Sequence, residues 1–263
     1  MPVLEVWRST GPPSRDLAFE AGLLERAAAG RCSVLVASWP GPAVVLGYAQ
    51  PPADADLDWC REQGIPVLRR LSGGTGVVHR GDLAVGLALP AEHEWGGAVL
   101  GLYERFLDVL EPALGALGSR ARRLEQPRRA SRVRSPVCFL DQLADTLAVD
   151  GRKVVGCSQV RRKGAVLVHA VVLLGLDPGL TARVFGVDEA AVQAGLAPAL
   201  EGVSWEGVAG AVVGRLAAAL DLDVVAAGEP APDPDRLAPY LVPGRWAPVP
   251  ERGMQAAPSR LHP

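Results

Sequence analysis

The chain has 263 residues, of which 49% are hydrophobic and 21% charged, and its formal net charge is −2. These values fit an ordinary globular protein with a substantial core, and so small a net charge gives no overall attraction for nucleic acids or anionic membranes. No uncharged apolar run approaches the roughly 20 residues that span a bilayer. Even the apolar stretch at 208–227 contains Arg215, Asp221 and Asp223.

The N-terminus and the cysteines bear on the compartment in which the protein works. Residues 1–8 have no basic segment followed by an apolar core, so we expect a first strand there and no signal peptide. The cysteines follow neither a CxxC nor a Cys/His spacing; they are Cys32, Cys60, Cys138 and Cys157. We therefore expect free thiols in a reducing cytoplasm and no bound metal.

Apolar periodicity and chain breakers predict alternating elements in the first 117 residues. Leu17, Ala21 and Leu24 recur at helical spacing and predict a helix at 14–29. Short apolar runs bounded by Pro or Gly predict strands at 33–38, 43–47, 66–70 and 82–89. Further helices are expected at 54–63 and 95–117.

The second half of the chain opens with a change of amino-acid composition. Residues 120–134 contain seven arginines and no sustained apolar period, which indicates a loop. Asp150 and Gly151 separate two apolar runs and predict a tight hairpin. We expect a strand at 165–174 and helices at 178–184, 188–197 and 205–220.

The order of these elements predicts an α+β fold with a mixed or antiparallel sheet flanked by helices. Prolines become frequent after Glu229, and such a segment buries little apolar surface. The expected organisation is therefore one catalytic domain at 1–225 and a Pro-rich C-terminal tail at 226–263.

Two arginines and a glycine-rich turn form the most distinctive segment. It contains Arg69, Arg70, Ser72, Gly73, Gly74 and Thr75, and His79 follows four residues later. Glycines let the backbone approach a ligand and aim several N–H groups at one anion. Successive strand residues alternate, so one arginine is expected to face the ligand while the other packs elsewhere. Neither the P-loop nor the Rossmann pattern is present, and a plain hairpin turn with surface arginines is the alternative.

Lys153 follows the predicted hairpin turn and precedes Gly156 and Gln159. An exposed lysine is the plainer interpretation, since most lysines lie on the surface. A lysine in this place is also able to bring a positive charge to an acyl phosphate or a developing oxyanion. Together, the turn and the lysine predict a cradle for an acyl or acyl-adenylate group.

Three segments in order resemble the motifs of one family. They are Leu46-Gly-Tyr-Ala-Gln50, the run from Arg69 to His79, and the run from Asp150 to His169. They are similar to the (I/L)GxxQ, RRxSGGG…H and G(R/K)K…Q…H motifs of the superfamily that contains lipoate–protein ligases, octanoyltransferases and biotin ligases. The resemblance spans residues 14–220 with gaps. It implies a biotin/lipoyl ligase-like catalytic domain in which the glycine turn and the lysine loop enclose an octanoyl or lipoyl chain.

The same resemblance implies roles for individual residues. Lys153 would hold the acyl carbonyl as a catalytic residue. The residues implied to bind substrate are Arg69, Arg70, Ser72, Gly73, Gly74, Thr75, His79, Gly156, Gln159 and His169.

Two chemistries occur in this superfamily, and they differ in cofactor. Ligases activate free lipoate with ATP and Mg, whereas cysteine-type octanoyltransferases take the acyl group from acyl carrier protein as an enzyme thioester and need no cofactor. Cys138-Phe139 resembles the cysteine–phenylalanine pair of the transferases, which implies that Cys138 is the nucleophile. Nearby cations would favour its thiolate. A small buried core residue is the alternative interpretation of Cys138.

We therefore expect an acyltransferase that modifies a lysine of lipoyl carrier domains, such as the glycine cleavage H protein or the E2 of 2-oxoacid dehydrogenases. An ATP-dependent lipoate–protein ligase and a non-catalytic acyl or cofactor binder are the alternatives. The arginines of 120–134 form either a solvated loop or a docking surface for an acidic carrier. No membrane or nucleic-acid partner is expected.

Overall fold

The computed structural model describes residues 2–124, 134–142 and 146–231. Its large sheet consists of β1 Val3–Ser9, β2 Cys32–Ala37, β6 Leu83–Pro90, β7 Arg122–Arg123, β8 Thr146–Val149, β9 Arg152–Arg162, β10 Ala165–Val172 and β11 Asp223–Gly228. The strand order is β11-β1-β2-β6-β10-β9-β8-β7. β11, β1 and β2 are parallel and the other neighbours are antiparallel. The sheet is therefore mixed, as predicted.

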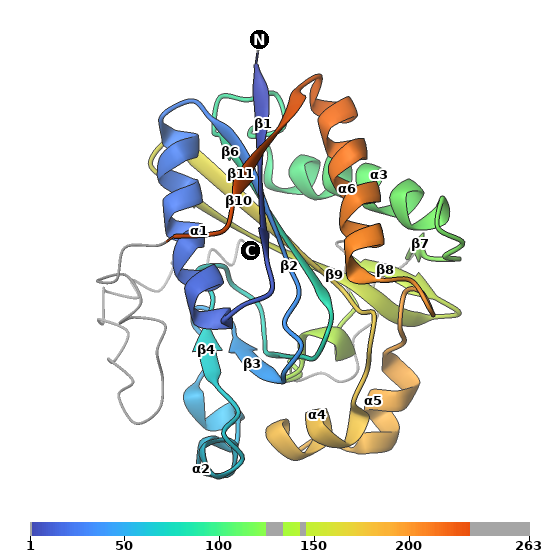
Figure 1. Ribbon diagram of the computed structural model, residues 1–263. Helices are drawn as coiled ribbons and strands as arrows, with labels where there is room; N and C mark the ends of the chain where they lie inside the picture. The colour runs from blue at the N-terminus through green and yellow to red at the C-terminus, as the bar shows by residue number, and fades with distance from the viewer. Residues whose placement is uncertain (1, 125–133, 143–145, 232–263) are drawn as a thin grey trace, which may run out of the picture.

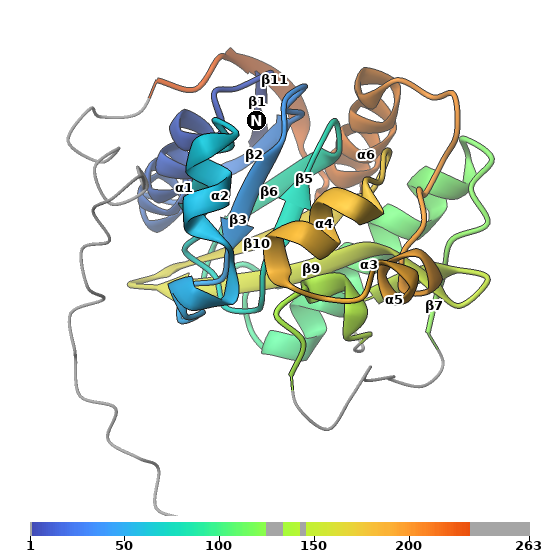
Figure 2. The ribbon, with the colours of Figure 1, turned by 90° about the horizontal axis from the view of Figure 1, so that it is seen from below.

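A second, three-stranded sheet carries the glycine turn. It consists of β3 Ala43–Leu46, β4 Val67–Arg69 and β5 Val77–His79, in the order β4-β3-β5. β3 is parallel to β4 and antiparallel to β5. Val45 and Leu68 share a buried cluster with Leu35 of β2, so the small sheet packs against the large one (Figure 2). This packing brings the turn between β4 and β5 to the large sheet.

The described helices are α1 Pro13–Ala28, α2 Leu57–Glu62, α3 Val99–Gly115, α4 Pro178–Phe185, α5 Glu189–Gly195 and α6 Trp205–Leu220, with short 3-10 segments η1 Pro52–Asp54 and η2 Cys138–Leu140. The three longest helices cover the two faces of the large sheet. α3 and α6 lie on one face and α1 lies on the other (Figure 1). Within the described ranges, no helix is long and apolar enough to cross a bilayer.

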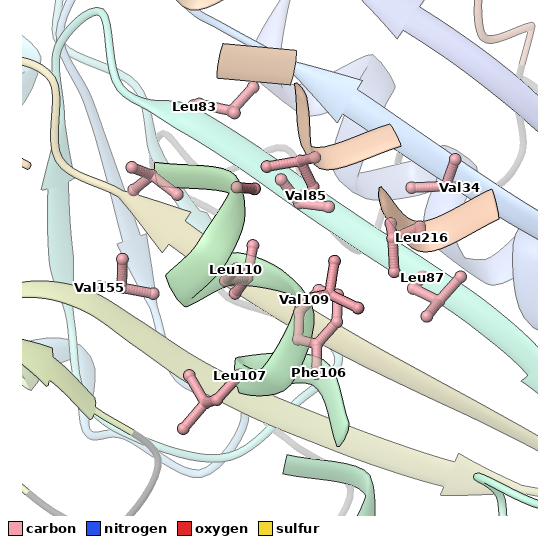
Figure 3. Packing of buried hydrophobic residues seen from close by; sticks show 14 of the residues in the cluster. Val34, Leu83, Val85, Leu87, Phe106, Leu107, Val109, Leu110, Val155 and Leu216 are labelled. Carbon is pink, nitrogen blue, oxygen red and sulfur yellow. The ribbon is translucent and has the colours of Figure 1, made fainter. Parts of the chain in front are cut away.

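Strand β6 shows how the core follows from the sequence. Side chains alternate across a strand, and Leu83, Val85 and Leu87 share the largest buried cluster with residues of α3 and α6. Phe106 and Leu110 of α3 lie in the same cluster, over these strand residues (Figure 3). The residues between them on β6 are small: Ala88 shares a cluster with residues of α1, and Ala84 and Gly86 line a cavity together with Leu17 and Glu20 of α1.

Local chemistry explains where several helices begin. Pro13 starts α1, where the fixed φ of proline suits the first turn. Asp56, Asp177 and Ser204 cap α2, α4 and α6 by accepting backbone N–H groups. The helix predicted at 54–63 is therefore divided, because the cap at Asp56 begins a new helix after η1. The helix predicted from residue 95 begins only at 99, after two glycines at 96 and 97.

The strand predictions need correction in four places. They omitted β5, which has only three residues after the turn, β7, which lies in the expected arginine loop, and β11, most of which is exposed. β9 extends to Arg162, well beyond the predicted run at 153–155. The pairing of β1 with β11 reaches Gly228, so the large sheet continues past the domain boundary expected at 225.

Parts of two predicted segments are outside the described residues. These parts are 125–133 of the arginine loop and 232–263 of the Pro-rich tail. The described start of the arginine loop includes β7, which pairs with β8. The division into a catalytic domain and a tail stays a prediction.

Truncation of Phe106 to Ala is expected to lower the free energy of unfolding by about 3–5 kcal/mol, because it leaves a cavity in the core. Phe106 is fully buried, whereas Leu100 on the same helix is 65% exposed. The matched change Leu100→Ala is expected to alter it by less than about 0.5 kcal/mol. Urea denaturation measures both. Equal losses in the two variants would contradict the described packing of α3.

Candidate active site

A pocket with about 660 Å³ of empty space, part of it open to solvent, lies between α1, the small sheet and the large sheet. Much of the wall is apolar and includes Leu17, Leu35, Ala37, Val45, Val77 and Val171. The cavity therefore has the lining of a site for a partly apolar ligand.

Small residues on the α1 face of the large sheet leave room for this cavity. Ala84 and Gly86 of β6 line it, and so do Gly156 and Ser158 of β9. In the register of the sheet, Gly86 lies opposite His169, which in turn lies opposite Ser158. The alternation of large and small residues thus fills one face of the sheet and leaves space on the other.

The glycine turn packs against the chain after β3 through a close approach of backbones. A Cβ at Gly47 would lie 2.0 Å from the carbonyl oxygen of Gly74, and Gly74 itself has a φ of +102°. Only glycine suits both positions without a shift of the chain. Ser72 joins the turn to β9, because its hydroxyl lies 2.8 Å from that of Ser158.

The two arginines before the turn diverge. Arg70 lines the cavity and donates to Ser72 Oγ and to the carbonyl of Gly73. Burial lowers the pKa of Arg70, while attraction to Cys138 and other groups opposes that shift. Arg69 instead donates to the carbonyls of Gly47 and Tyr48. It therefore holds the chain after β3 and does not line the cavity.

Cys138 lies at the cavity wall, and Lys153 binds the segment that carries it. Cys138 lines the cavity and begins η2. The side chain of Lys153 is 2% exposed, and its Nζ donates to the carbonyls of Cys138 at 3.2 Å and Asp141 at 3.1 Å. The same Nζ lies 5.1 Å from the centre of the Phe139 ring. Lys153 is thus a buried cation that binds the short segment carrying Cys138.

Gly156 leaves the space that the side chain of Lys153 occupies. A Cβ at residue 156 would lie 2.8 Å from Lys153 Cε and 3.2 Å from its Nζ. Both distances are shorter than the optimal separation of non-bonded atoms. The space that the Lys153 side chain needs therefore explains why residue 156 is a glycine.

His79 stands at another wall of the cavity and is neutral. Burial, together with the charge of Arg70, lowers the pKa of His79 to about 3. Its ring packs edge-on against Trp39 at 4.8 Å, and the indole of Trp39 donates to Asp16 Oδ2 at 2.8 Å. Its Nδ1 lies 3.9 Å from Asp82 Oδ2. Burial raises the pKa of Asp82 to about 8, although three backbone N–H groups oppose the shift.

His169 pairs with an acidic residue of α1. Its Nδ1 lies 2.8 Å from Glu20 Oε1, and both side chains line the cavity. Neither His169 Nε2 nor Glu20 Oε2 has a hydrogen-bond partner within the described part of the chain. The cavity therefore contains two polar atoms that a bound molecule is able to contact.

The remaining sequence-predicted residues lie elsewhere. Gln159 donates to the carbonyl of Val99 at 2.8 Å, on the α3 side of the sheet. Ser72, Gly73, Gly74 and Thr75 build the turn without lining the cavity. Lys153 reaches the cavity only through Cys138.

Sequence reasoning missed Asp16, Glu20 and Trp39, which all line the cavity. Asp16 and Glu20 are four residues apart on α1, on the same buried face as Leu17 and Leu24. Two acidic residues within an apolar helical stripe were the available signal. Within the described residues, no group of three or more His, Cys, Asp or Glu side chains is placed to hold a metal ion.

The sequence matches a known family. Residues 12–204 match the lipoyl protein ligase A/B catalytic domain, so the chain belongs to that family. The chain is 30% identical over 186 residues to an octanoyltransferase LipM of Exiguobacterium, covering 67% of each protein. It is also 30% identical over 194 residues to the LipM of Geobacillus kaustophilus, covering 69% of this chain and 70% of the relative.

Solved structures agree on the fold. A lipoate–protein ligase A crystallised with ATP superposes with a TM-score of 0.71 at 20% identity, covering 90% of this chain and 91% of that one. A bipartite lipoate–protein ligase from Thermoplasma acidophilum, studied with its E2 lipoyl domain, gives a TM-score of 0.70 at 20% identity, covering 90% and 89%. The α+β ligase-like fold and the family resemblance expected from the sequence are confirmed.

Asp82 is expected to make folding stability depend on pH. The pKa of its carboxyl is about 8 in the folded protein and 3.8 in the unfolded chain. The contribution of Asp82 to the free energy of unfolding therefore falls as the pH rises from 3.8 to about 8. His79 has the opposite slope, but only below its ordinary value of 6.5. Between pH 6.5 and 8.5 the free energy of unfolding should therefore fall by roughly 1–2 kcal/mol through Asp82.

Urea denaturation at the two pH values tests this expectation. Asp82→Asn mimics the protonated carboxyl and should remove most of the fall. Asp58→Asn makes the same change at an exposed carboxylate and should keep the slope of the unmodified protein. The same slope in Asp82→Asn would show that Asp82 is ionised in the folded protein.

Proposed function

We propose that the protein is an octanoyltransferase of protein lipoylation that carries the acyl group on Cys138. The observation that carries the proposal is the setting of Cys138, which lines the cavity while Lys153 Nζ binds its carbonyl. Arg70 lines the same cavity and interacts electrostatically with Cys138. The name octanoyltransferase LipM of the relatives supports the same activity.

The proposed reaction has two steps at the thioester level. In the first, the Cys138 thiolate attacks the carbonyl carbon of an octanoyl thioester on acyl carrier protein. The carrier C–S bond breaks, and the carrier thiolate leaves and takes up a proton. In the second step, the ε-amine of a lysine on a lipoyl domain attacks the enzyme thioester. An amide forms, the amine loses a proton, and the Cys138 thiol is restored.

The walls of the cavity fit an acyl chain that ends at Cys138. We assign contact with the acyl group to the predicted residues that line the cavity, Arg70, His79, Gly156 and His169. Lys153 is proposed to polarise the acyl carbonyl, in addition to holding the segment of Cys138. The arrangement of Arg69, Ser72, Gly73, Gly74 and Thr75 favours a supporting role, and Gln159 is not proposed to bind substrate.

The proposed acceptors are lipoyl domains, such as the glycine cleavage H protein or the E2 of 2-oxoacid dehydrogenases. The free thiols Cys32, Cys60, Cys138 and Cys157 support work in a reducing cytoplasm. An ATP-dependent ligase is the second candidate, since the fold is shared with a lipoate–protein ligase A bound to ATP. The reaction of the proposed transferase needs neither ATP nor Mg.

The covalent intermediate gives the first test of this function. Incubation with octanoyl–acyl carrier protein, without ATP, is expected to yield an octanoyl adduct by intact mass that hydroxylamine removes. Cys138→Ser should abolish the hydroxylamine-labile adduct, whereas Cys60→Ser, at a buried thiol outside the cavity, should retain it. Modification of a lipoyl domain only with lipoate and ATP, unaffected by Cys138→Ser, would establish the ligase instead.

The space at Gly156 gives a second test. Gly156→Ala forces Lys153 away from its carbonyl acceptors and is expected to slow acylation of Cys138 by roughly tenfold or more. Gly214→Ala is the control, because a Cβ there meets nothing within 4 Å, and alanine suits a helix. Single-turnover mass spectrometry measures both rates. An unchanged rate in Gly156→Ala would contradict the expected displacement of Lys153.

A further inference from the structure

The carboxamide of Gln50 joins two parts of the site that are distant in the sequence. Its Oε1 accepts from the backbone N–H of Gly47 at 3.2 Å. Its Nε2 donates to Asp54 Oδ2 and to the carbonyl of Pro136, both at 3.0 Å. Gln50 is 5% exposed, so these contacts are shielded from water and each is costly to lose.

The carbonyl of Pro136, two residues before Cys138, accepts hydrogen bonds from two donors, of which Gln50 is one. It also accepts from the backbone N–H of Gly76 at 2.8 Å, and the N–H of Cys138 donates back to the carbonyl of Gly76 at 2.8 Å. Gly76 and Val137 thus form a short parallel bridge. Gln50 adds a side-chain contact to this bridge, in addition to the contact that Lys153 makes with the Cys138 carbonyl.

The contacts of Gln50 separate into a local pair and a distant one. Gly47 and Asp54 belong to the same stretch of chain as Gln50, so those two contacts stabilise the turn after β3. The contact with Pro136 crosses 86 residues and bears on the segment of Cys138 alone. A role in the site therefore depends on the donor Nε2 and its bond to Pro136.

We infer that Gln50 is a positioning residue for the nucleophile: its bond to Pro136 fixes the segment that bears Cys138 against the glycine turn. The inference rests on the proposed function, since it assumes acyl transfer to Cys138. Loss of this bond leaves the cavity and the binding of octanoyl–acyl carrier protein unchanged, but it allows the thiol of Cys138 to shift. Misplacement of a nucleophile lowers the rate of the chemical step.

The substitution Gln50→Glu tests the donor specifically. The new carboxylate still offers an acceptor to the N–H of Gly47, but it faces the carboxylate of Asp54 and the carbonyl of Pro136 without a proton to donate. The double variant Gln50→Glu with Asp54→Asn restores the local pair with donor and acceptor exchanged, and still lacks a donor for Pro136. Gln193→Glu is the matched control, because exposed Gln193 donates to a carboxylate, Glu189 Oε1, at 3.0 Å.

The measurement is single-turnover acylation of Cys138 from octanoyl–acyl carrier protein over a range of donor concentrations, together with the thermal midpoint. The Gln50→Glu protein should lose roughly tenfold or more in maximal rate, as expected for one buried hydrogen bond. Its half-saturating donor concentration should change little. The double variant should recover the midpoint and keep the low rate, and Gln193→Glu should match the unmodified protein.

The possible outcomes separate the inference from the function beneath it. An unmodified protein that forms no Cys138 adduct refutes the proposed function itself. An unmodified protein that forms the adduct, with Gln50→Glu equally fast, refutes the positioning role alone. Recovery of both rate and midpoint in the double variant also refutes it, because Gln50 would then act only through the turn.

Discussion

The buried amino group of Lys153 is the interaction on which the site depends. An ammonium group removed from water has to find acceptors, because an unpaired buried charge is costly. It finds them in the carbonyls of Cys138 and Asp141 and in the face of the Phe139 ring. Lys153 belongs to β9, within the large sheet. The segment of Cys138 is thereby fixed to a rigid element, as precise chemistry requires.

Close backbone contacts fix the same segment to the glycine turn. Gly47 and Gly74 approach so closely that no side chain fits between them, and Gly76 faces the ring of Phe185 in the same way. Gly76 is then free to exchange hydrogen bonds with the chain around Cys138. The glycines of the turn therefore serve backbone packing in this fold, and only Arg70 extends from the turn segment into the cavity.

Much of the fold followed from apolar periodicity, and the failures have physical causes. β11 lies at the edge of the sheet with Val224 and Val225 about half exposed, so no buried alternation marks it. Gln159 was grouped with the substrate residues by its motif, yet it lies one residue after Ser158 on β9. The period of two already directs neighbouring residues to opposite faces. Family motifs identify candidate site residues, but the alternation of side chains along a strand decides which of them face the ligand.

The polar residues of the cavity were harder to foresee, because their partners come from distant elements. Glu20 pairs with His169 of β10, and Asp16 pairs with Trp39, which follows β2. Only the folded chain brings these pairs together. The shared fold with lipoate–protein ligases shows that such a cavity does not by itself decide a reaction, since one fold hosts several chemistries. In this chain η2 places the thiol of Cys138 at the cavity wall, on a segment held both by Lys153 and by the glycine turn. If Cys138 accepts the acyl group, that thiol is what makes this acyl-binding fold a transferase.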